Sequence, residues 1–339
     1  MKHPLLLTIL CLLVGLQALA QDTIITMTTT KDSVSLYVVW TGAGSITANG
    51  VKLDNDYFIE NIITTADGSV VLTAMGEVLF IDLWCHNNSL STLDITNCPM
   101  LSILNCSQNS LKDLDVTKCT KLKSLACYLN SLTDLNVRKC PELTGLECDR
   151  NYLTALDITK CLELKSLSCS NNSLTDLDVT KCLELTVLYC GNNFLRTLDV
   201  SKGTMLKDLS CPYNSLSALD VTNCTELITL ACENNSLSVL DITKCTRLGT
   251  LYASGQTLML PTVERIDDDK LSIKNLITFV DDNIGIDNIS HGGTYADGHI
   301  TWIVSGESGE VTFDFTTKLP KYLAGRPYSG TVTQSWTKK

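Results

Sequence analysis

A pattern of apolar and polar positions repeats every 21 residues through the middle of the chain, from Phe80 to Leu258. Within one repeat, Leu104 and Cys106 lie two positions apart with the polar Asn105 between them. A β-strand places residues two apart on the same face, so the leucine and the cysteine are predicted to point inward together. One repeat cannot bury its apolar side chains alone, whereas stacked repeats bury them all. We therefore predict a solenoid in which each coil adds one short strand to a parallel sheet.

Two series of cysteines and one series of asparagines carry this period. The first cysteine series comprises Cys85, Cys106, Cys127, Cys148, Cys169, Cys190, Cys211 and Cys232. The second comprises Cys98, Cys119, Cys140, Cys161, Cys182, Cys224 and Cys245, with Gly203 in the remaining place. The asparagine series comprises Asn88, Asn109, Asn130, Asn151, Asn172, Asn193, Asn214 and Asn235. We expect the asparagines to satisfy backbone groups at the turn after each strand.

The cysteines are predicted to be two inward ladders of buried thiols. Disulfides between coils are an alternative on distance alone, since neighbouring strands lie within bridging range. Side chains stacked in register point the same way, however, which does not suit an unstrained bridge. A metal site would need convergent ligands such as CxxC pairs, and the sequence has none, so no metal or other cofactor is expected. Buried reduced cysteine behaves as a small apolar residue.

The segment Leu101–Cys119 has the form LxxLxCxxNxLxxLDVTKC. It resembles the bacterial leucine-rich repeat pattern LxxLxLxxNxL with cysteine in place of the third leucine. More closely, it is similar to the cysteine-containing 21-residue repeats of internalin-type bacterial surface proteins. The resemblance covers residues 80–258, as eight repeats and a partial ninth. It implies a leucine-rich repeat solenoid with a parallel β-sheet on its concave face and a non-helical or 3-10 convex side, and a role in adhesion or host interaction.

The segments on either side of the repeat lack its period. Residues 1–20 have a short polar start, an apolar run and a small-residue cleavage site, as in a signal peptide. Residues 21–79 and 259–339 alternate β-type runs with turn signals, which predicts an N-terminal β cap and a C-terminal β-sandwich-like module. We expect an exported protein that is secreted, periplasmic or attached to the cell surface.

The net charge of the chain limits the classes of partner that it is expected to bind. The chain has a formal net charge of −11 and no basic run, so phosphate backbones and anionic membranes are poor candidates. After the leader, no stretch is long and apolar enough to span a membrane. We therefore expect neither nucleic-acid binding nor membrane insertion, and a protein or glycan as the ligand.

Selectivity is expected at positions that the repeat does not fix. These lie on the outward side of the strands, where scattered aromatic residues could anchor a ligand. The predicted ligand-binding residues of the concave face are Trp84, His86, Asn105, Tyr128, Glu147, Asp149, Tyr189, Tyr213, Glu233 and Tyr252.

The predicted function is non-enzymatic binding. A second hypothesis is a spacer that presents the C-terminal module as the binding unit. A third is a hydrolase that uses Glu147 and Asp149, whose spacing on one strand face could suit paired carboxylates. An open sheet offers no pocket that would shield these carboxylates from water, so we do not expect catalysis, and no catalytic residues are assigned.

Overall fold

The computed structural model describes residues 24–41, 44–53, 58–76, 79–237, 240–242 and 244–259, and strand segments between residues 264 and 337. The predicted signal peptide, residues 1–20, lies outside the described residues. The chain forms two compact units, Met1–Cys161 and Leu162–Lys339. Strands and turns account for the regular structure that the described residues form, with no helix among them.

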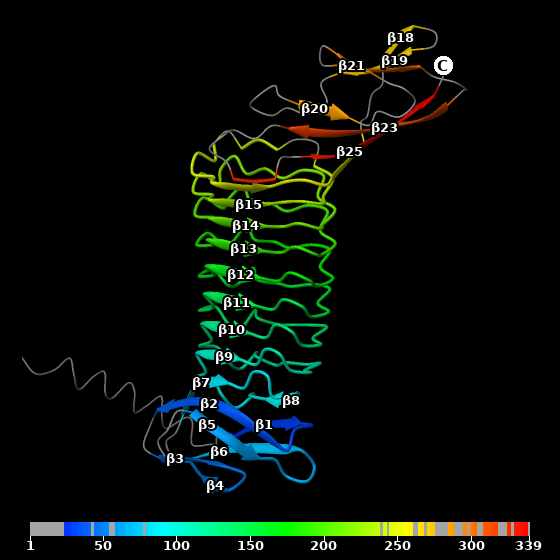
Figure 1. Cartoon of the computed structure of the whole chain (residues 1–339). Helices are drawn as coiled ribbons and strands as arrows, with labels where there is room; N and C mark the ends of the chain where they lie inside the picture. Colours follow the sequence, from blue (N-terminus) through cyan, green and yellow to red (C-terminus); the bar gives the residue numbers. More distant parts are fainter. Residues whose placement is uncertain are drawn as a thin grey trace, which may run out of the picture. The chain divides into compact units, whose positions relative to one another are not determined.

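The first unit begins with strands that precede the repeats (Figure 1). They are β1 (Ile24–Thr29), β2 (Ser33–Thr41), β3 (Gly44–Ala48), β4 (Val51–Lys52), β5 (Phe58–Ile63) and β6 (Ser69–Gly76). Four of them join β8 (Leu90–Asp94) in a five-stranded sheet of order β4-β3-β6-β1-β8. Strand β2 pairs antiparallel with both β5 and β7 (Leu79–Trp84). Both sheets thus continue directly into the first coil.

The coils of the first unit add parallel strands in strict register. These strands are β7, β9 (Ile103–Asn105), β10 (Ser124–Ala126) and β11 (Gly145–Glu147). The strand order is β11-β10-β9-β7-β2-β5. Leu104 pairs with Leu83 on one side and with Leu125 on the other. Equivalent repeat positions therefore stack on one another, as the 21-residue period requires.

The second unit repeats this arrangement. Its coils carry β12 (Ser166–Ser168), β13 (Val187–Tyr189), β14 (Asp208–Ser210), β15 (Thr229–Ala231) and β16 (Thr250–Tyr252). Strand β24 (Ala324–Arg326) pairs in parallel with β16, in the order β24-β16-β15-β14-β13-β12.

The C-terminal strands of this unit form two four-stranded sheets. One has the order β17-β25-β23-β20 and the other β18-β19-β22-β21. Their strands are β17 (Gln256–Met259), β18 (Glu264–Asp267), β19 (Lys270–Lys274), β20 (Ile284–Asp287), β21 (Thr294–Ala296), β22 (His299–Ile303), β23 (Ser308–Thr317) and β25 (Ser329–Thr337). Strand β17 immediately follows the last coil, so its pairing with β25 links the repeat to these sheets.

The core consists of the repeated leucines and cysteines. Leu104 and Cys106 are both fully buried, as are their counterparts Leu146 and Cys148. Burying one leucine side chain contributes roughly 1.5–3 kcal/mol, and each coil buries several. The smaller cysteine fills the remaining space on the same face of the strand. The prediction of two inward cysteine ladders is confirmed, because every cysteine in the described part of the chain is a buried, reduced thiol.

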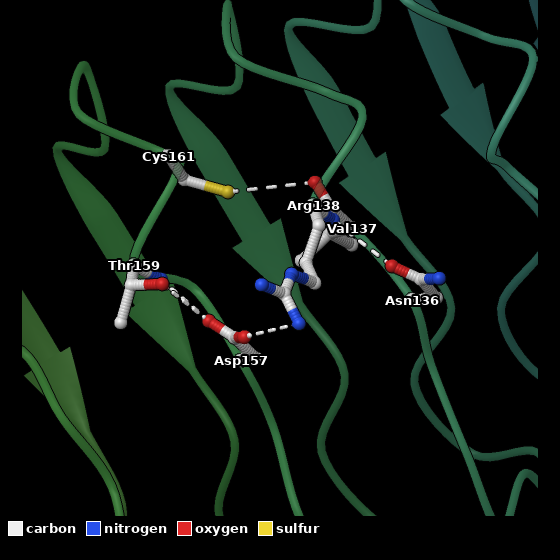
Figure 2. Close-up of polar contacts among 6 residues, drawn as sticks. All are labelled: Asn136, Val137, Arg138, Asp157, Thr159 and Cys161. Carbon is white, nitrogen blue, oxygen red and sulfur yellow. Dashed lines mark hydrogen bonds and ion pairs between the residues drawn. The ribbon is translucent and has the colours of Figure 1, made fainter.

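The return side of each coil is built from tight turns, which confirms the predicted non-helical side (Figure 2). Asp157 Oδ1 accepts hydrogen bonds from the backbone N and the hydroxyl of Thr159, at 3.0 and 2.6 Å. The thiol of Cys161 donates to the backbone carbonyl of Val137 in the preceding coil, at 3.8 Å. Arg138 forms an ion pair with Asp157 at 3.2 Å. In this coil the turn is therefore closed by a short Asp–Thr contact and joined to the preceding coil by a cysteine of the second series. In the preceding coil, Asn136 takes the place of the aspartate and accepts from the backbone N of Arg138.

The chain is thus a leucine-rich repeat solenoid with parallel strands on one side of each coil. The structure also confirms that the asparagine series satisfies backbone groups. The Nδ2 group of Asn109 donates to the carbonyls of Cys85 and Cys106, both at 3.0 Å. Its Oδ1 accepts from the backbone N of Leu90 at 2.9 Å. Asn109 therefore bonds to its own coil and to the preceding one, and Asn130, Asn151, Asn193, Asn214 and Asn235 do the same.

Candidate functional site

In each unit, the outward positions of the strands and the two residues after each first-series cysteine form a surface, which we call the strand face of that unit. In the first unit this surface runs across the strands β7 to β11. The strand face of the first unit includes the row Trp84, Asn105, Ala126 and Glu147, whose residues pair directly across the strands. His86, Tyr128 and Asp149 each lie two residues further along. Six of the predicted site residues lie on this strand face, and all are exposed or half-buried. They are Trp84, His86, Asn105, Tyr128, Glu147 and Asp149.

The second unit carries the other four predicted residues on its own strand face. Tyr189 and Tyr252 lie in the row Ser168, Tyr189, Ser210, Ala231 and Tyr252. Tyr213 and Glu233 follow the strands of their coils. Tyr189 is 41% exposed and Tyr213 is 57% exposed, so both rings are open to a partner. Glu233 Oε2 is buried and has no hydrogen-bond partner among the described residues.

One position in each coil, two residues after the first-series cysteine, has a left-handed backbone. Asparagine and glycine adopt this conformation at little cost, and Asn171, Asn192, Asn234 and Gly255 do so here. The same position is leucine in one coil and tyrosine in another. Leu129 has φ 54° and Tyr213 has φ 52°.

Leu129 is 40% exposed and Tyr213 is 57% exposed, so neither side chain gains burial in return for its unfavourable backbone. Backbone strain that local packing does not explain is a pointer to function. Gln108 and Arg150 hold the same position with φ 56° and 52°, and both are exposed. Among these residues, Leu129 in the first unit and Tyr213 in the second are the ones that present an apolar side chain.

Two more aromatic residues break a repeat position that is otherwise serine. Tyr152 and Phe194 directly follow Asn151 and Asn193, and they are 63% and 61% exposed. Ser110, Ser131, Ser173, Ser215 and Ser236 hold the same place in other coils. The sequence prediction missed Tyr152, Phe194 and Leu129, although each departs from the repeat and so carried a signal.

At the first coil the strand face extends onto β2. Tyr37 pairs in register with Trp84, and the two rings stack with centroids 4.6 Å apart and planes 22° apart. They lie beside a groove of about 580 Å³. The groove is lined by Lys31, Ser33, Ser35, Tyr37, Trp84, His86, Asn87 and Asn88. The sequence pointed to Trp84 and His86 only, because nothing in an unrepeated segment shows which residues β2 places beside them.

The buried thiols do not form a reactive site. Burial raises the pKa of the Cys106 and Cys190 thiols from about 9 to about 12. A thiol reacts as its thiolate, so these groups are inert near neutral pH. In the described part of the chain, no group of three His, Cys, Asp or Glu side chains is placed to hold a metal ion. The cysteines are therefore structural.

The carboxylates Glu147 and Asp149 do not line the groove. Glu147 is exposed, as expected for a residue on an open sheet. Among the described residues, no helix has the length and apolar character needed to cross a membrane.

Two family models match parts of the chain. Residues 163–203 match the model described as Leucine Rich repeats (2 copies), and residues 284–337 match LRR adjacent. No curated protein matches the chain. The match to the model LRR adjacent covers the C-terminal strands from β20 to β25.

Solved structures of two Listeria monocytogenes proteins are similar to the chain. The functional domain of InlJ, described as including a cysteine ladder, is 27% identical with a TM-score of 0.53. That match covers 75% of this chain but only 66% of the InlJ chain, just under two thirds. InlP is 21% identical with a TM-score of 0.53, over 72% of this chain and 76% of InlP. With its buried cysteine ladders and stacked coils, the chain is a leucine-rich repeat solenoid that is similar to these two solved structures.

Proposed function

We propose that this chain is a non-enzymatic binding protein that recognises a protein partner through the strand faces of its repeat units. The observation that carries the proposal is that each unit exposes an apolar side chain in left-handed backbone, Leu129 in the first unit and Tyr213 in the second. Asparagine at these two positions would relieve the strain and cover less apolar surface. A contact with a partner gives a reason for leucine and tyrosine instead.

The surroundings of these residues fit a protein interface. Tyr152 is exposed on the coil that follows that of Leu129, and Phe194 on the coil that precedes that of Tyr213. Tyrosine and other aromatic residues are enriched among the residues that dominate binding energy at interfaces. Repeat proteins use their extended strand surfaces for such contacts.

Exposed apolar residues also occur on the return side, at Leu162 and Leu183. Single exposed leucines are common on protein surfaces and need no explanation. Neither has a left-handed backbone, unlike Leu129 and Tyr213. The strand face is therefore the better candidate, and it also argues against a spacer whose only binding unit is the C-terminal module.

The proposal places binding outside the cytoplasm, since residues 1–20 have the sequence of a signal peptide. Adhesion or host interaction is the role we infer for such a surface. A glycan ligand is the second candidate, supported by aromatic residues among small polar ones on the same face.

The test uses the chain without its predicted leader, residues 21–339, as a probe on arrays of proteins and glycans. Binding to a protein should fall by about tenfold or more in Tyr189→Ala with Tyr213→Asn, because the few residues that dominate an interface, tyrosine often among them, each contribute about 2 kcal/mol or more. The matched control is Leu183→Ala, an exposed apolar residue on the return side of the same unit. Equal binding by the double variant and the wild type would place the site elsewhere. Binding to glycans alone would favour the second candidate.

A further inference from the structure

We propose that the groove between β2 and the first coil binds an acidic peptide segment of the protein partner. The inference rests on the proposed function, because it assigns part of the same partner to one end of the first unit's strand face. The groove residues come from two places, Lys31 to Tyr37 on and before β2, and Trp84 to Asn88 in the first coil.

The groove is a fixed structure and not a chance hollow between loops. Asn88 is buried and joins its two walls. Its Oδ1 accepts from the backbone N of Ser35 at 3.0 Å, and its Nδ2 donates to the carbonyl of Ser35 at 2.8 Å. The same Nδ2 donates to the carbonyl of His86 at 3.2 Å. Asn88 thus joins the first coil to β2, as Asn109 and Asn130 join their coils to the preceding coil.

Lys31 is held in place at one side of the groove. Its Nζ donates to the backbone carbonyl of Asn87 at 2.6 Å, and its backbone N donates to the hydroxyl of Thr29 at 3.1 Å. An ammonium group has three donors, so at least one further hydrogen bond is available to a ligand. Because the contact with Asn87 restricts this long side chain before a ligand arrives, less rotamer entropy is lost on binding.

The charge of the groove differs from that of the chain. The full chain carries a net charge of −11, yet the described residues that line the groove include Lys31 and His86 and no aspartate or glutamate. Asp32 follows Lys31 in the chain but does not line the groove. An ammonium group with hydroxyl and amide neighbours favours a carboxylate, and charge-assisted bonds of this kind are strong. The groove is therefore suited to an anionic group.

A peptide fits this groove better than a sugar does. Tyr37 and Trp84 stack on each other, so each covers one face of the other and reduces the ring surface on which a sugar could lie. Ser33 and Ser35 alternate along β2 and supply hydroxyls of the kind that bond peptide groups. The groove is also continuous with the row that begins at Trp84 and includes Asn105. A partner on the strand face can thus extend a chain segment into it.

The experiment selects peptides from a random phage library on the full chain without its leader, residues 21–339. The selected peptides should be enriched in aspartate and glutamate. A labelled selected peptide is then titrated by fluorescence polarisation against wild type, Lys31→Met and Lys52→Met. Lys52 is an exposed lysine on β4 that does not line the groove, and it serves as the matched control.

Lys31→Met should weaken peptide binding by about tenfold, since it removes one charge-assisted hydrogen bond while keeping the apolar stem. Lys52→Met should bind as wild type does. Neutral or basic selected peptides, no selected peptides, or equal binding by Lys31→Met and wild type would each overturn the inference. Binding of glycans, lost in Lys31→Met, would also overturn it in favour of a sugar site.

The two proposals fail in different ways. If protein binding depends on Tyr189 and Tyr213 but not on Lys31, the groove inference is wrong and the proposed function stands. If no protein binds the array at all, the proposed function fails first.

Discussion

The side-chain amide of Asn130 donates a hydrogen bond to the backbone carbonyl of Cys106, one coil away, at 3.0 Å. A second bond from the same Nδ2 reaches the carbonyl of Cys127 at 3.1 Å, and Oδ1 accepts from the backbone N of Leu111 at 3.0 Å. Asn130 is only 8% exposed, so water cannot readily replace these bonds. One buried side chain therefore closes its own turn and joins two coils.

Replacing Asn130 by alanine should lower the free energy of unfolding by about 2–4 kcal/mol, because buried backbone groups lose their partners. Urea unfolding followed by circular dichroism measures the change. Thr133→Ala, at an exposed position in the same coil, is the control and should have little effect. Asn130→Asp should be at least as damaging as alanine, since it turns a carboxylate towards two carbonyls. A loss no larger than that of Thr133→Ala would contradict the role given to the asparagine series.

The thiols should be accessible only after unfolding. After removal of the leader with Cys11, the chain holds 15 of its 16 cysteines. Because the described cysteines are buried and burial raises their pKa, they should react slowly with a thiol reagent at pH 8. In denaturant without reductant, all 15 should react at once. A count well below 15 under those conditions would show that disulfides form after all.

The same thiols should make stability fall in alkaline solution. In the folded chain the pKa of Cys106 is raised to about 12 by burial, whereas an unfolded thiol ionises near 9. The buried, protonated thiol therefore contributes fully to the free energy of unfolding below about pH 9. This contribution is lost as the pH rises towards 12, because the unfolded chain then releases a proton that the folded chain keeps. The urea midpoint measured from pH 8 to pH 11 should fall less steeply in Cys106→Ala than in the wild type. Parallel curves would argue against this linkage.

A proline in the next coil leaves no room for a side chain at Gly191. A Cβ at Gly191 would lie 2.8 Å from Cδ of Pro212 and 3.1 Å from its backbone carbonyl oxygen. Gly191→Ala should therefore cost about 1–3 kcal/mol, as overpacking generally does.

Adding Pro212→Ser should recover much of this loss, because it removes the ring while leaving the carbonyl. Gly145→Ala is the control, since its nearest neighbour would be Ser124 Oγ at 3.9 Å. A double-mutant cycle on urea midpoints measures the coupling between positions 191 and 212. Strictly additive effects would show that the ring is not the cause.

The period made the fold predictable from sequence. Leu104 and Cys106 repeat at fixed spacing, and a fixed spacing can bury both only on stacked strands. The outward row from Trp84 to Glu147 follows from the same register. The groove could not be predicted in this way. Tyr37 meets Trp84 through an antiparallel pairing with β2, outside the repeat, and no sequence spacing relates the two residues.

The departures within the repeat are an intermediate case. Leu129 and Tyr213 stand at a position held by asparagine or glycine in several other coils. Asparagine and glycine at this position indicate a left-handed backbone. The prediction, however, rests on the alternation of apolar and polar positions, which carries no information about the sign of φ. Only the φ values show that the two side chains are presented at a cost.

This cost leads to the final prediction, that the strand face is less stable than it could be. Leu129→Asn and Tyr213→Asn should each raise the free energy of unfolding by about 0.5–1 kcal/mol, because asparagine tolerates the left-handed backbone that leucine and tyrosine resist. Urea unfolding of the single variants measures this change. Asn192→Tyr, the reverse substitution at the equivalent position of another coil, should be destabilising by a similar amount. If the proposed function holds, Tyr213→Asn should gain stability and lose partner binding together. A variant that loses both would mean that Tyr213 contributes to packing, and the strain argument for a binding surface would fail.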